Sequence, residues 1–261
     1  MAFLVLAAGE NFLTSNQKMN RKEFLKKSSM LGAGISLIPG ASALASSFSQ
    51  SNQDFFFTRI RYDSGNWFVD ERMPSNLLHS LVQYTTVSVD TEEHVVPLSS
   101  DRILDAPFAY ITGHRLVQFS RREREHFEKL VYNGGFIFAD DCNHDIDGLF
   151  ARSFEQQMAD IFGPEALVKI PNDHPIYSSF FQFDDGPPTA AVEMNGWGDG
   201  LVHDYLKAIE IDGEIRVLYS NKDYGCEWDY DFRNKRWYAN DNTKFGVNIV
   251  MYAMNRRSGF S

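Results

Sequence analysis

One stretch of the sequence, Val131–Asp145, constrains the fold more than any other. Two glycines at 134 and 135 end a helical pattern, four apolar residues follow at 136–139, and Asp140 and Asp141 come directly after them. A short apolar run between turn residues and polar residues is typical of a buried strand. In open α/β sheets ligands bind outside the carboxyl ends of the strands, so we expect the functional site where this strand ends.

Strands and helices alternate over most of the remaining chain. Apolar and β-branched runs predict strands at residues 55–62, 86–89, 108–112, 136–139 and 166–170, with a polar loop at 90–93. Helical periodicity and a capping box at Ser120 and Glu123 predict helices at 74–84, 120–133 and 150–162. A hairpin at 208–219 and a helix at 245–254 close the chain. This alternation predicts an α/β fold with a mostly parallel sheet.

Composition limits the classes of function. The formal net charge is −10 and the pI is near 5.1, which argues against a nucleic-acid partner, because phosphate binding depends on Lys and Arg. The two cysteines are too few for a disulfide-stapled scaffold or a four-thiolate zinc site. An apolar content of 43% is ample for a packed core.

The first 53 residues carry the pattern of an export signal. A basic segment at 19–27, an apolar run at 30–39 and the small residues Ala43 and Ala45 follow one another in the order that signal peptidase requires. The basic segment is similar to a twin-arginine signal in which Lys22 replaces the second arginine. We therefore expect a periplasmic or cell-envelope protein.

These features divide the chain into four expected parts. Residues 1–18 are an over-long start, 19–45 the export signal, 46–53 a flexible leader and 54–261 a single folded domain. In the alternative interpretation, the signal stays uncleaved as an amphipathic anchor, which would be the protein's one contact with a membrane.

Five motifs carry a resemblance to a known family. They are Phe57–Tyr62 (FTRIRY), Tyr110–His114 (YITGH), Gly134–Asn143 (GGFIFADDCN), Asp173–Tyr177 (DHPIY) and Asp223–Cys226 (DYGC). In this order they resemble the bacterial family called domain of unknown function 4159, which is similar to the class I glutamine-amidotransferase-like fold near the trehalose-utilisation proteins. The resemblance implies a flavodoxin-like three-layer sandwich with a C-terminal hairpin and closing helix. It implies no established activity.

The catalytic set of an amidotransferase is missing. That family carries its cysteine in a Gly-x-Cys-x-Gly elbow and a His-x-Glu pair late in the chain. Here Cys142 has no flanking glycines, and no His-x-Glu follows Tyr205. We therefore do not expect glutaminase activity, and whether the protein is an enzyme stays open.

Four loops should meet at one edge of a parallel sheet, namely 63–67, 113–114, 140–145 and 223–228. Apolar walls with a few convergent polar groups are typical of small-molecule sites. The ligand-binding candidates on these loops are Asp63, Asn66, Trp67, His114, Asp140, Asp141, Asn143, Asp223, Tyr224 and Cys226.

A divalent metal is one possible cofactor. Carboxylates with one imidazole suit magnesium, manganese or zinc, and the candidate ligands are Asp140, Asp141, His144 and Asp145. In the alternative interpretation, Asp140 and Asp141 only cap the next helix and accept hydrogen bonds from loop amides.

Cys142 admits three interpretations. With His114 as its base and Asp141 beside it, it is a candidate nucleophile. In the second interpretation it forms a disulfide with Cys226, since disulfides persist in exported proteins. In the third it stays a free structural thiol.

Aromatic residues and arginines leave further alternatives. Trp67, Trp197, Trp228 and Trp237 with Tyr224 either stack on sugar rings or pack as ordinary aromatics. Either one of Arg59 and Arg61 reaches the site as an anion clamp, or both pair with surface carboxylates.

We expect an exported, amidotransferase-like domain that binds a small molecule, with carbohydrate as one candidate, or an envelope partner. The first alternative is a hydrolase that uses a metal at Asp140, Asp141 and His144, or the thiol of Cys142. The second is a structural subunit of an envelope complex.

Overall fold

The structure is a computed structural model that describes residues 55–194, 201–229 and 242–257. The expected over-long start, export signal and leader lie outside the described residues, as do Trp197 and Trp237.

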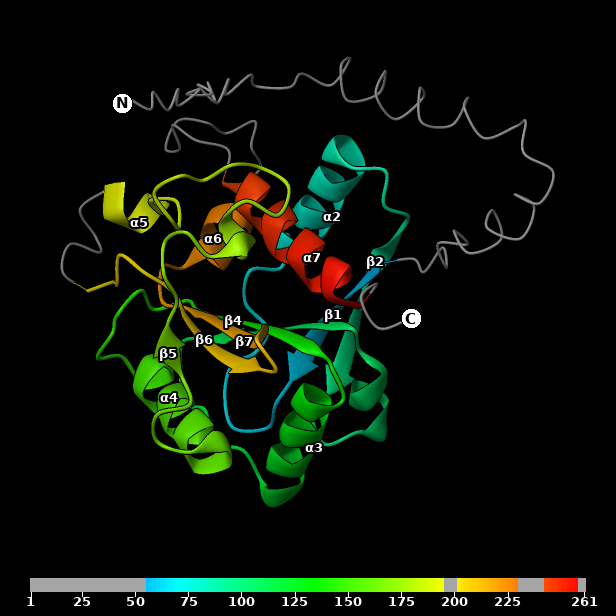
Figure 1. The fold of residues 1–261 in the computed structure, drawn as a ribbon. Helices are drawn as coiled ribbons and strands as arrows, with labels where there is room; N and C mark the ends of the chain where they lie inside the picture. Colours follow the sequence, from blue (N-terminus) through cyan, green and yellow to red (C-terminus); the bar gives the residue numbers. More distant parts are fainter. Residues whose placement is uncertain (1–54, 195–200, 230–241, 258–261) are drawn as a thin grey trace, which may run out of the picture. The chain divides into compact units, whose positions relative to one another are not determined.

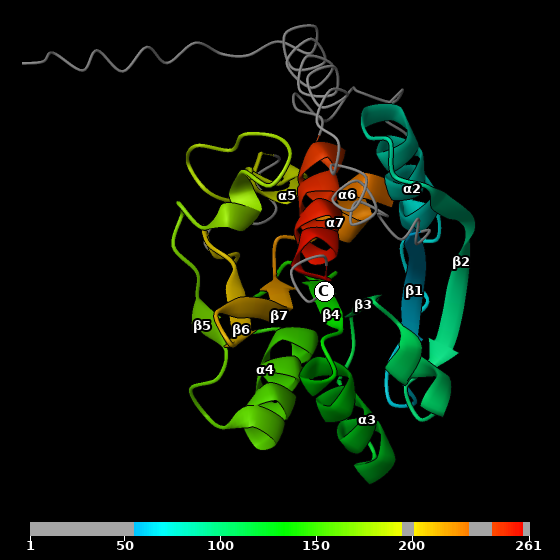
Figure 2. The ribbon, with the colours of Figure 1, turned by 45° about the vertical axis from the view of Figure 1, so that its right-hand side comes forward.

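A single seven-stranded sheet organises the described residues, with strand order β2-β1-β3-β4-β7-β6-β5. The strands are β1 (Phe55–Arg61), β2 (Val89–Pro97), β3 (Phe108–Gly113), β4 (Phe136–Asp141), β5 (Val168–Lys169), β6 (Lys207–Ile211) and β7 (Glu214–Ser220). The five strands from β2 to β7 in that order are parallel, and β6 and β5 continue the sheet antiparallel. Figure 2 shows β2 and β5 at opposite edges. The predicted α/β fold with a mostly parallel sheet is confirmed.

Helices cover both faces of the sheet. They are α2 (Met73–Tyr84), α3 (Arg121–Tyr132), α4 (Leu149–Phe162), α5 (Ala191–Met194), α6 (Tyr224–Asp229) and α7 (Thr243–Arg257), with short 3-10 turns η3 (Asp101–Asp105) and η4 (Pro175–Tyr177). One face carries α2, α6 and α7, and the other carries α3 and α4 (Figure 1). This is the layered arrangement of a flavodoxin-like fold. No helix in the described ranges has the length and apolarity that a membrane crossing requires.

Strand alternation gives each face its own core. In β4, Phe136 and Phe138 join the core beneath α2 and α7, whereas Ile137 and Ala139 join the core above α3 and α4. Successive side chains of a strand point to opposite faces. The two aspartates that end β4 therefore lie on different sides of the sheet.

The connection from α3 to β4 returns the chain abruptly into the sheet. Gly134 follows the end of the helix and has a φ of 90°, a conformation that residues with a side chain rarely adopt. At Gly135 a Cβ atom would lie 2.5 Å from Leu130 Cδ1 and 2.8 Å from the Leu130 carbonyl oxygen. Both glycines are needed for β4 to start so close to the end of α3.

Two predicted elements differ from the structure. The strand predicted at 86–89 and the loop at 90–93 are wrong, because β2 begins at Val89 and runs through the polar residues to Pro97. β2 is an edge strand, and charged residues on an edge protect it from further pairing. The strand predicted at 166–170 shrinks to two residues of antiparallel edge.

The strand order fixes the place of the site. From β1 the chain moves to β2 on one side, and β3 lies on the other side of β1, which makes this the topological switch point. β1, β3, β4 and β7 are mutually parallel, so their carboxyl ends share one edge of the sheet. The segments that follow these four strands carry the expected site residues. The one predicted as a loop at 223–228 is mostly the short helix α6.

Candidate functional site

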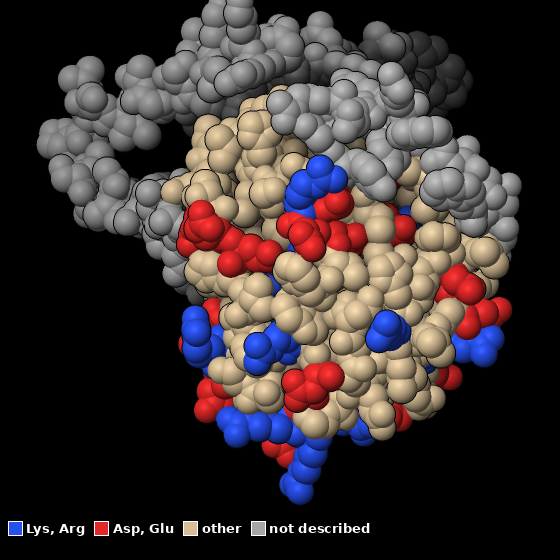
Figure 3. All heavy atoms as spheres, turned by 180° about the vertical axis from the view of Figure 1, so that it is seen from behind, with Lys and Arg blue, Asp and Glu red and all other residues tan. Residues whose placement is uncertain are grey.

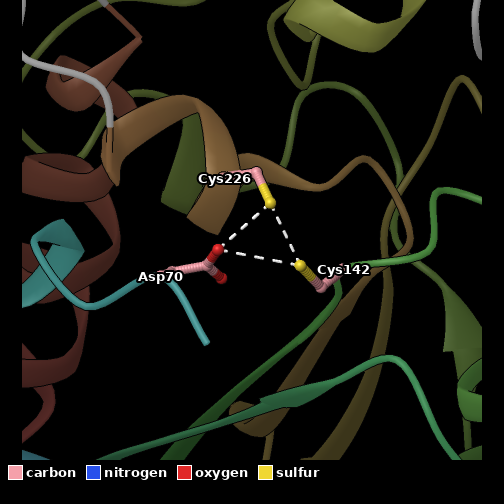
Figure 4. Close-up of side chains that lie close together, drawn as sticks. All are labelled: Asp70, Cys142 and Cys226. Atoms are coloured by element: carbon pink, nitrogen blue, oxygen red, sulfur yellow. Dashed lines mark hydrogen bonds between the residues drawn. The ribbon is translucent and has the colours of Figure 1, made fainter. Parts of the chain in front are cut away.

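Asp70, Cys142 and Cys226 converge at this edge of the sheet. Asp70 lies on the loop between β1 and α2, Cys142 directly follows β4, and Cys226 lies in α6 (Figure 4). Asp70 Oδ1 is 3.0 Å from Cys226 Sγ and 3.7 Å from Cys142 Sγ, and the two sulfurs are 3.0 Å apart. Within the described ranges, this is the one group of three or more such side chains whose ligand atoms all lie within 4.8 Å of one another.

Both cysteines are free thiols in the structure. Cys142 is buried at 3% exposure, and Cys226 is partly exposed. The contact with Cys226 lowers the pKa of Cys142, but burial and the nearby carboxylates outweigh it, so the pKa of both cysteines lies above its usual range and both are thiols.

Arg59 explains why Asp70 faces the thiols. Its fully buried guanidinium donates hydrogen bonds to the carbonyl oxygens of Val69 (2.6 Å) and Asp70 (3.1 Å) and pairs with Glu93. These contacts fix the backbone of the loop while leaving the Asp70 carboxylate for the site. Arg59 is thus neither an anion clamp nor a surface ion pair; Arg61 is exposed.

Backbone strain concentrates at the site. In the part of the chain that the structure describes, four residues other than glycine have positive φ, and three of them are Asp70 (54°), His144 (43°) and Asp223 (57°). The fourth, Asp212, lies in the β6–β7 hairpin turn. Such conformations persist only where the surroundings fix them, and they cluster at functional sites.

Buried carboxylate oxygens surround the thiols. Asp140 Oδ2 accepts from the Gly225 amide at 2.6 Å, and Asp141 Oδ1 accepts from the Asn143 amide at 2.9 Å. The second oxygen of each has no hydrogen-bond partner among the described groups, and the same holds for Asp70 Oδ2 and Asp223 Oδ1. Unpaired buried oxygens of this kind are costly, so these oxygens are suited to hold a proton or to accept a hydrogen bond or a cation.

Burial raises the pKa of all four carboxyls. It raises the pKa of Asp70 to about 6 and that of Asp141 to about 7. The pKa of Asp140 lies well above its usual range, through burial and then the charge of Asp223. Burial also raises the pKa of Asp223, although its hydrogen bond with His144 opposes this.

Two imidazoles lie beside the cluster. His144 Nδ1 is 3.4 Å from Asp223 Oδ2, and this hydrogen bond raises the pKa of His144. Asn66 Oδ1 accepts from the backbone amides of His114 (2.9 Å) and Arg115 (3.0 Å), so its Nδ2 faces His114 Nδ1 at 2.9 Å and donates to it. Neutral His114 therefore carries its proton on Nε2. Burial lowers the pKa of His114.

Gly225 lets α6 approach the sheet. A Cβ atom there would lie 2.3 Å from Tyr110 Oη, 2.6 Å from Asp70 Oδ2 and 3.3 Å from Asp140 Oδ2. Only a residue without a side chain fits, and this approach brings the neighbouring Cys226 to the cluster. This close approach explains why the Asp223–Cys226 motif contains a glycine.

The structure separates the remaining predicted residues into several roles. Asn66 and Asn143 tie loops together, and Asn143 Nδ2 donates to the His114 carbonyl oxygen at 2.6 Å. Asp63 is exposed, and Trp67 packs edge-on against exposed Phe68. Tyr224 is fully buried in the core, and Trp228 stacks against it. Both residues therefore pack as ordinary core aromatics and do not stack on sugar rings.

The metal ligands predicted from sequence are not the group that the structure brings together. Asp140, Asp141, His144 and Asp145 lie outside it, and Asp145 Oδ1 instead accepts from the Asp147 amide at 2.9 Å. Asp70 was not predicted. The one signal that could have found it is its place on the loop after β1, the first strand of the switch point.

Comparison with known proteins gives a family without an assigned activity. No curated protein matches the sequence. Residues 56–254 match the model of the family described as Domain of unknown function (DUF4159), and the chain belongs to this family.

Proposed function

We propose that this protein binds a divalent transition-metal ion, zinc foremost, through Asp70, Cys142 and Cys226. The metal is presented at the carboxyl edge of the sheet to a small molecule or an envelope partner. The observation that carries the proposal is the convergence of three ligand atoms, from three separate segments, within 4.8 Å of one another.

The kinds of ligand favour zinc over magnesium or manganese. Thiolates select softer ions, whereas magnesium and manganese prefer carboxylate, carbonyl and water oxygens. Tetrahedral zinc with Zn–S bonds of about 2.3 Å separates two sulfurs by about 3.8 Å. The Cys142–Asp70 distance of 3.7 Å already suits such a site, and the sulfurs, at 3.0 Å, would move apart by somewhat less than 1 Å.

The surroundings need positive charge. Asp140 and Asp223 are buried and lie near the three ligands, and each has an unpartnered oxygen. The buried guanidinium of Arg59 is already occupied by three carbonyl oxygens and Glu93. A bound dication would supply positive charge beside these oxygens, which have no cationic partner among the groups that the structure describes.

Hydrolysis is the second candidate function, and one observation favours it. Three protein ligands leave a fourth coordination position for water, as in catalytic rather than structural zinc sites. Metal-bound water is a nucleophile at neutral pH. The other hydrolytic mechanism, attack by the Cys142 thiol, is less favoured because that side chain is only 3% exposed.

We also infer a relationship to class I glutamine amidotransferases and a place in the periplasm or cell envelope. The parallel strand order around the switch point supports the first, and Asp141 and Asn143 on either side of Cys142 support the loss of glutaminase activity. The pattern at 19–45 supports export. N-terminal sequencing of the protein isolated from the producing cell tests export, since retention of residues 19–45 in a cytoplasmic fraction would refute it.

Metal binding is tested on the purified, reduced protein. We expect one zinc ion per chain by elemental analysis and, with cobalt, the intense near-ultraviolet charge-transfer bands of thiolate ligation. Asp70→Asn, Cys142→Ser and Cys226→Ser each weaken binding strongly. Asp145→Asn, in the same acidic loop but outside the group, is the matched control and retains it. Equal losses in Asp145→Asn and Asp70→Asn, or no bound metal in the reduced protein, would refute the proposal.

The ligand is sought with the metal-loaded protein. Thermal-shift measurements with glycans and envelope fragments test small-molecule binding, and hydrolysis of ester and phosphate-ester panels by the metal-loaded protein tests the second candidate. Absence of any shift or turnover, together with co-purification of an envelope protein, would instead support a structural subunit.

A further inference from the structure

We propose that Cys142 and Cys226 form a modification site, a dithiol that is oxidised to a disulfide by exchange with a small disulfide reagent, with Cys226 as the thiol that reacts first. The cross-link removes two of the three metal ligands. Its regulatory meaning therefore rests on the proposed function, but the chemistry of the thiol pair does not.

The two sulfurs are placed to bond. Their separation is 3.0 Å, and a disulfide bond is about 2.05 Å long, so the sulfurs need to approach by only about 1 Å. They come from positions 84 residues apart, on the end of β4 and on α6. Pairing across such a sequence separation requires the folded sheet edge.

Exposure sets the order of reaction. Cys142 is 3% exposed, whereas Cys226 is partly exposed, so a reagent from solvent reaches Cys226 first. Asp70 Oδ1 accepts hydrogen bonds from both thiols and holds them side by side. Cys226 is thus the entry thiol and Cys142 the resolving thiol.

The steps balance as two thiol–disulfide exchanges. The Cys226 sulfur gives up its proton and attacks one sulfur of the reagent R–S–S–R, which releases one RSH and leaves Cys226 joined to the other half. The Cys142 sulfur then gives up its proton, attacks the Cys226 sulfur and releases the second RSH. Two protein thiols are oxidised, and one reagent disulfide is reduced to two thiols.

The local charge selects the reagent. Above their raised pKa values, Asp223, Asp70 and Asp140 place negative charge near the Cys142 sulfur, and Asp223 and Asp70 place it near Cys226. A field of one sign attracts reagents of the opposite sign and repels those of the same sign, in a manner that salt screens. A cationic disulfide should therefore react faster than an anionic one.

Metal and oxidant compete for the same sulfurs. Zinc bound to both thiolates blocks their attack on the reagent, and the disulfide leaves only Asp70 of the three metal ligands. In an oxidising envelope, bound metal would decide whether the thiols persist.

The test uses the reduced, metal-free protein and two reagents, cationic cystamine and anionic glutathione disulfide. Intact mass is expected to show the loss of two hydrogens in the wild type. Cys142→Ser is expected to stop at the mixed disulfide on Cys226, and Cys226→Ser to react far more slowly. Cystamine should be faster by roughly tenfold or more at low salt, with the difference narrowing at high salt.

Several outcomes overturn the inference: a wild type that stops at the mixed disulfide, Cys226→Ser reacting as fast as Cys142→Ser, or glutathione disulfide outpacing cystamine. The metal measurement is separate. Zinc binding without cross-linking refutes the disulfide inference and leaves the proposed metal binding standing. Cross-linking without zinc binding refutes the proposed metal binding and leaves the disulfide inference standing.

Discussion

At the scale of single residues, Arg59 determines where a site residue points. It is fully buried, and its planar guanidinium reaches three backbone carbonyls and a carboxylate at once. A lysine has the same charge but lacks this fork of donors. Asp70 therefore depends on a side chain that does not itself belong to the proposed metal group.

Arg59→Lys is expected to weaken zinc binding by roughly 10-fold to 100-fold, the range for groups that orient metal ligands. The reason is that the 67–70 loop loses its anchor and Asp70 its fixed direction. Competition with a chromogenic chelator measures the affinity. Arg61→Lys, exposed on the same strand, is the control and should bind as the wild type does. Unchanged affinity in Arg59→Lys would mean that the loop is held by other contacts.

Gly225→Ala is expected to lower the free energy of unfolding by about 1–3 kcal/mol, because its Cβ would overlap Tyr110 Oη and Asp70 Oδ2. Tyr110→Phe removes the nearest of these atoms, so the double variant should lose less than the two single variants together. Urea unfolding of the four proteins gives the coupling energy. Strict additivity would contradict the overlap.

At the scale of elements, α3 joins the sheet through its first turn. The predicted capping box is present, with the Ser120 hydroxyl accepting from the Glu123 amide and Glu123 Oε2 accepting from the Ser120 amide at 2.8 Å. Glu123 is 1% exposed, and its Oε1 also accepts from the Asp63 amide at 3.0 Å. One glutamate thus caps the helix and anchors the loop after β1.

Ser120→Ala should therefore cost about 1 kcal/mol of stability, the usual effect of losing a cap. Glu123→Ala should cost more, since it also leaves the Asp63 amide without its acceptor. Glu125, exposed on the same helix and paired with Arg121, is the matched control, and its replacement by alanine should change stability by less than about 0.5 kcal/mol. Chemical denaturation checks all three variants. Equal effects of the two glutamate substitutions would show that Glu123 has no role beyond its charge.

The turn before η4 predicts a pH dependence. His174 Nδ1 accepts from the Ile176 amide at 3.2 Å, and burial lowers the pKa of His174. His174 therefore binds a proton more readily in the unfolded chain than in the folded protein. The stability that neutral His174 contributes is complete above about pH 6.5, and it is lost as the pH falls toward the lower pKa that His174 has in the folded protein. His174→Asn, which keeps an acceptor, should lose less stability between pH 7.5 and 5.5 than the wild type. A parallel loss in both proteins would assign the effect to other groups.

Local patterns predicted the elements better than they predicted the site. The capping box, β4 and the β6–β7 hairpin were predicted because each is encoded within a short segment. β2 was misplaced because an edge strand carries charges that otherwise indicate a loop. Asp70 was missed because a buried arginine from another strand determines its direction, and that tertiary contact leaves no local pattern.

At the scale of the whole molecule, charge is distributed unevenly. On the face seen in Figure 3, acidic side chains gather in a band, whereas Lys and Arg lie apart without forming a continuous patch. This agrees with the net charge of −10. At the site, three carboxyls with little exposure lie near the two thiols, namely those of Asp70, Asp140 and Asp223. The folded chain thus concentrates negative charge where the proposed ligand is a cation.

Metal binding should accordingly stabilise the whole fold. A ligand that binds only the native state adds about 2.7 kcal/mol when its free concentration is 100 times its dissociation constant, which for a domain of this size raises Tm by roughly 5–10 °C. The gain arises because zinc joins the β1 loop, the end of β4 and α6, three segments that unfolding separates. Calorimetry with zinc, and then with excess chelator to reverse the shift, measures it. Asp70→Asn and Cys226→Ser should abolish the shift, and Asp145→Asn should retain it. A shift that survives in Asp70→Asn and Cys226→Ser would refute binding at the Asp70, Cys142 and Cys226 group.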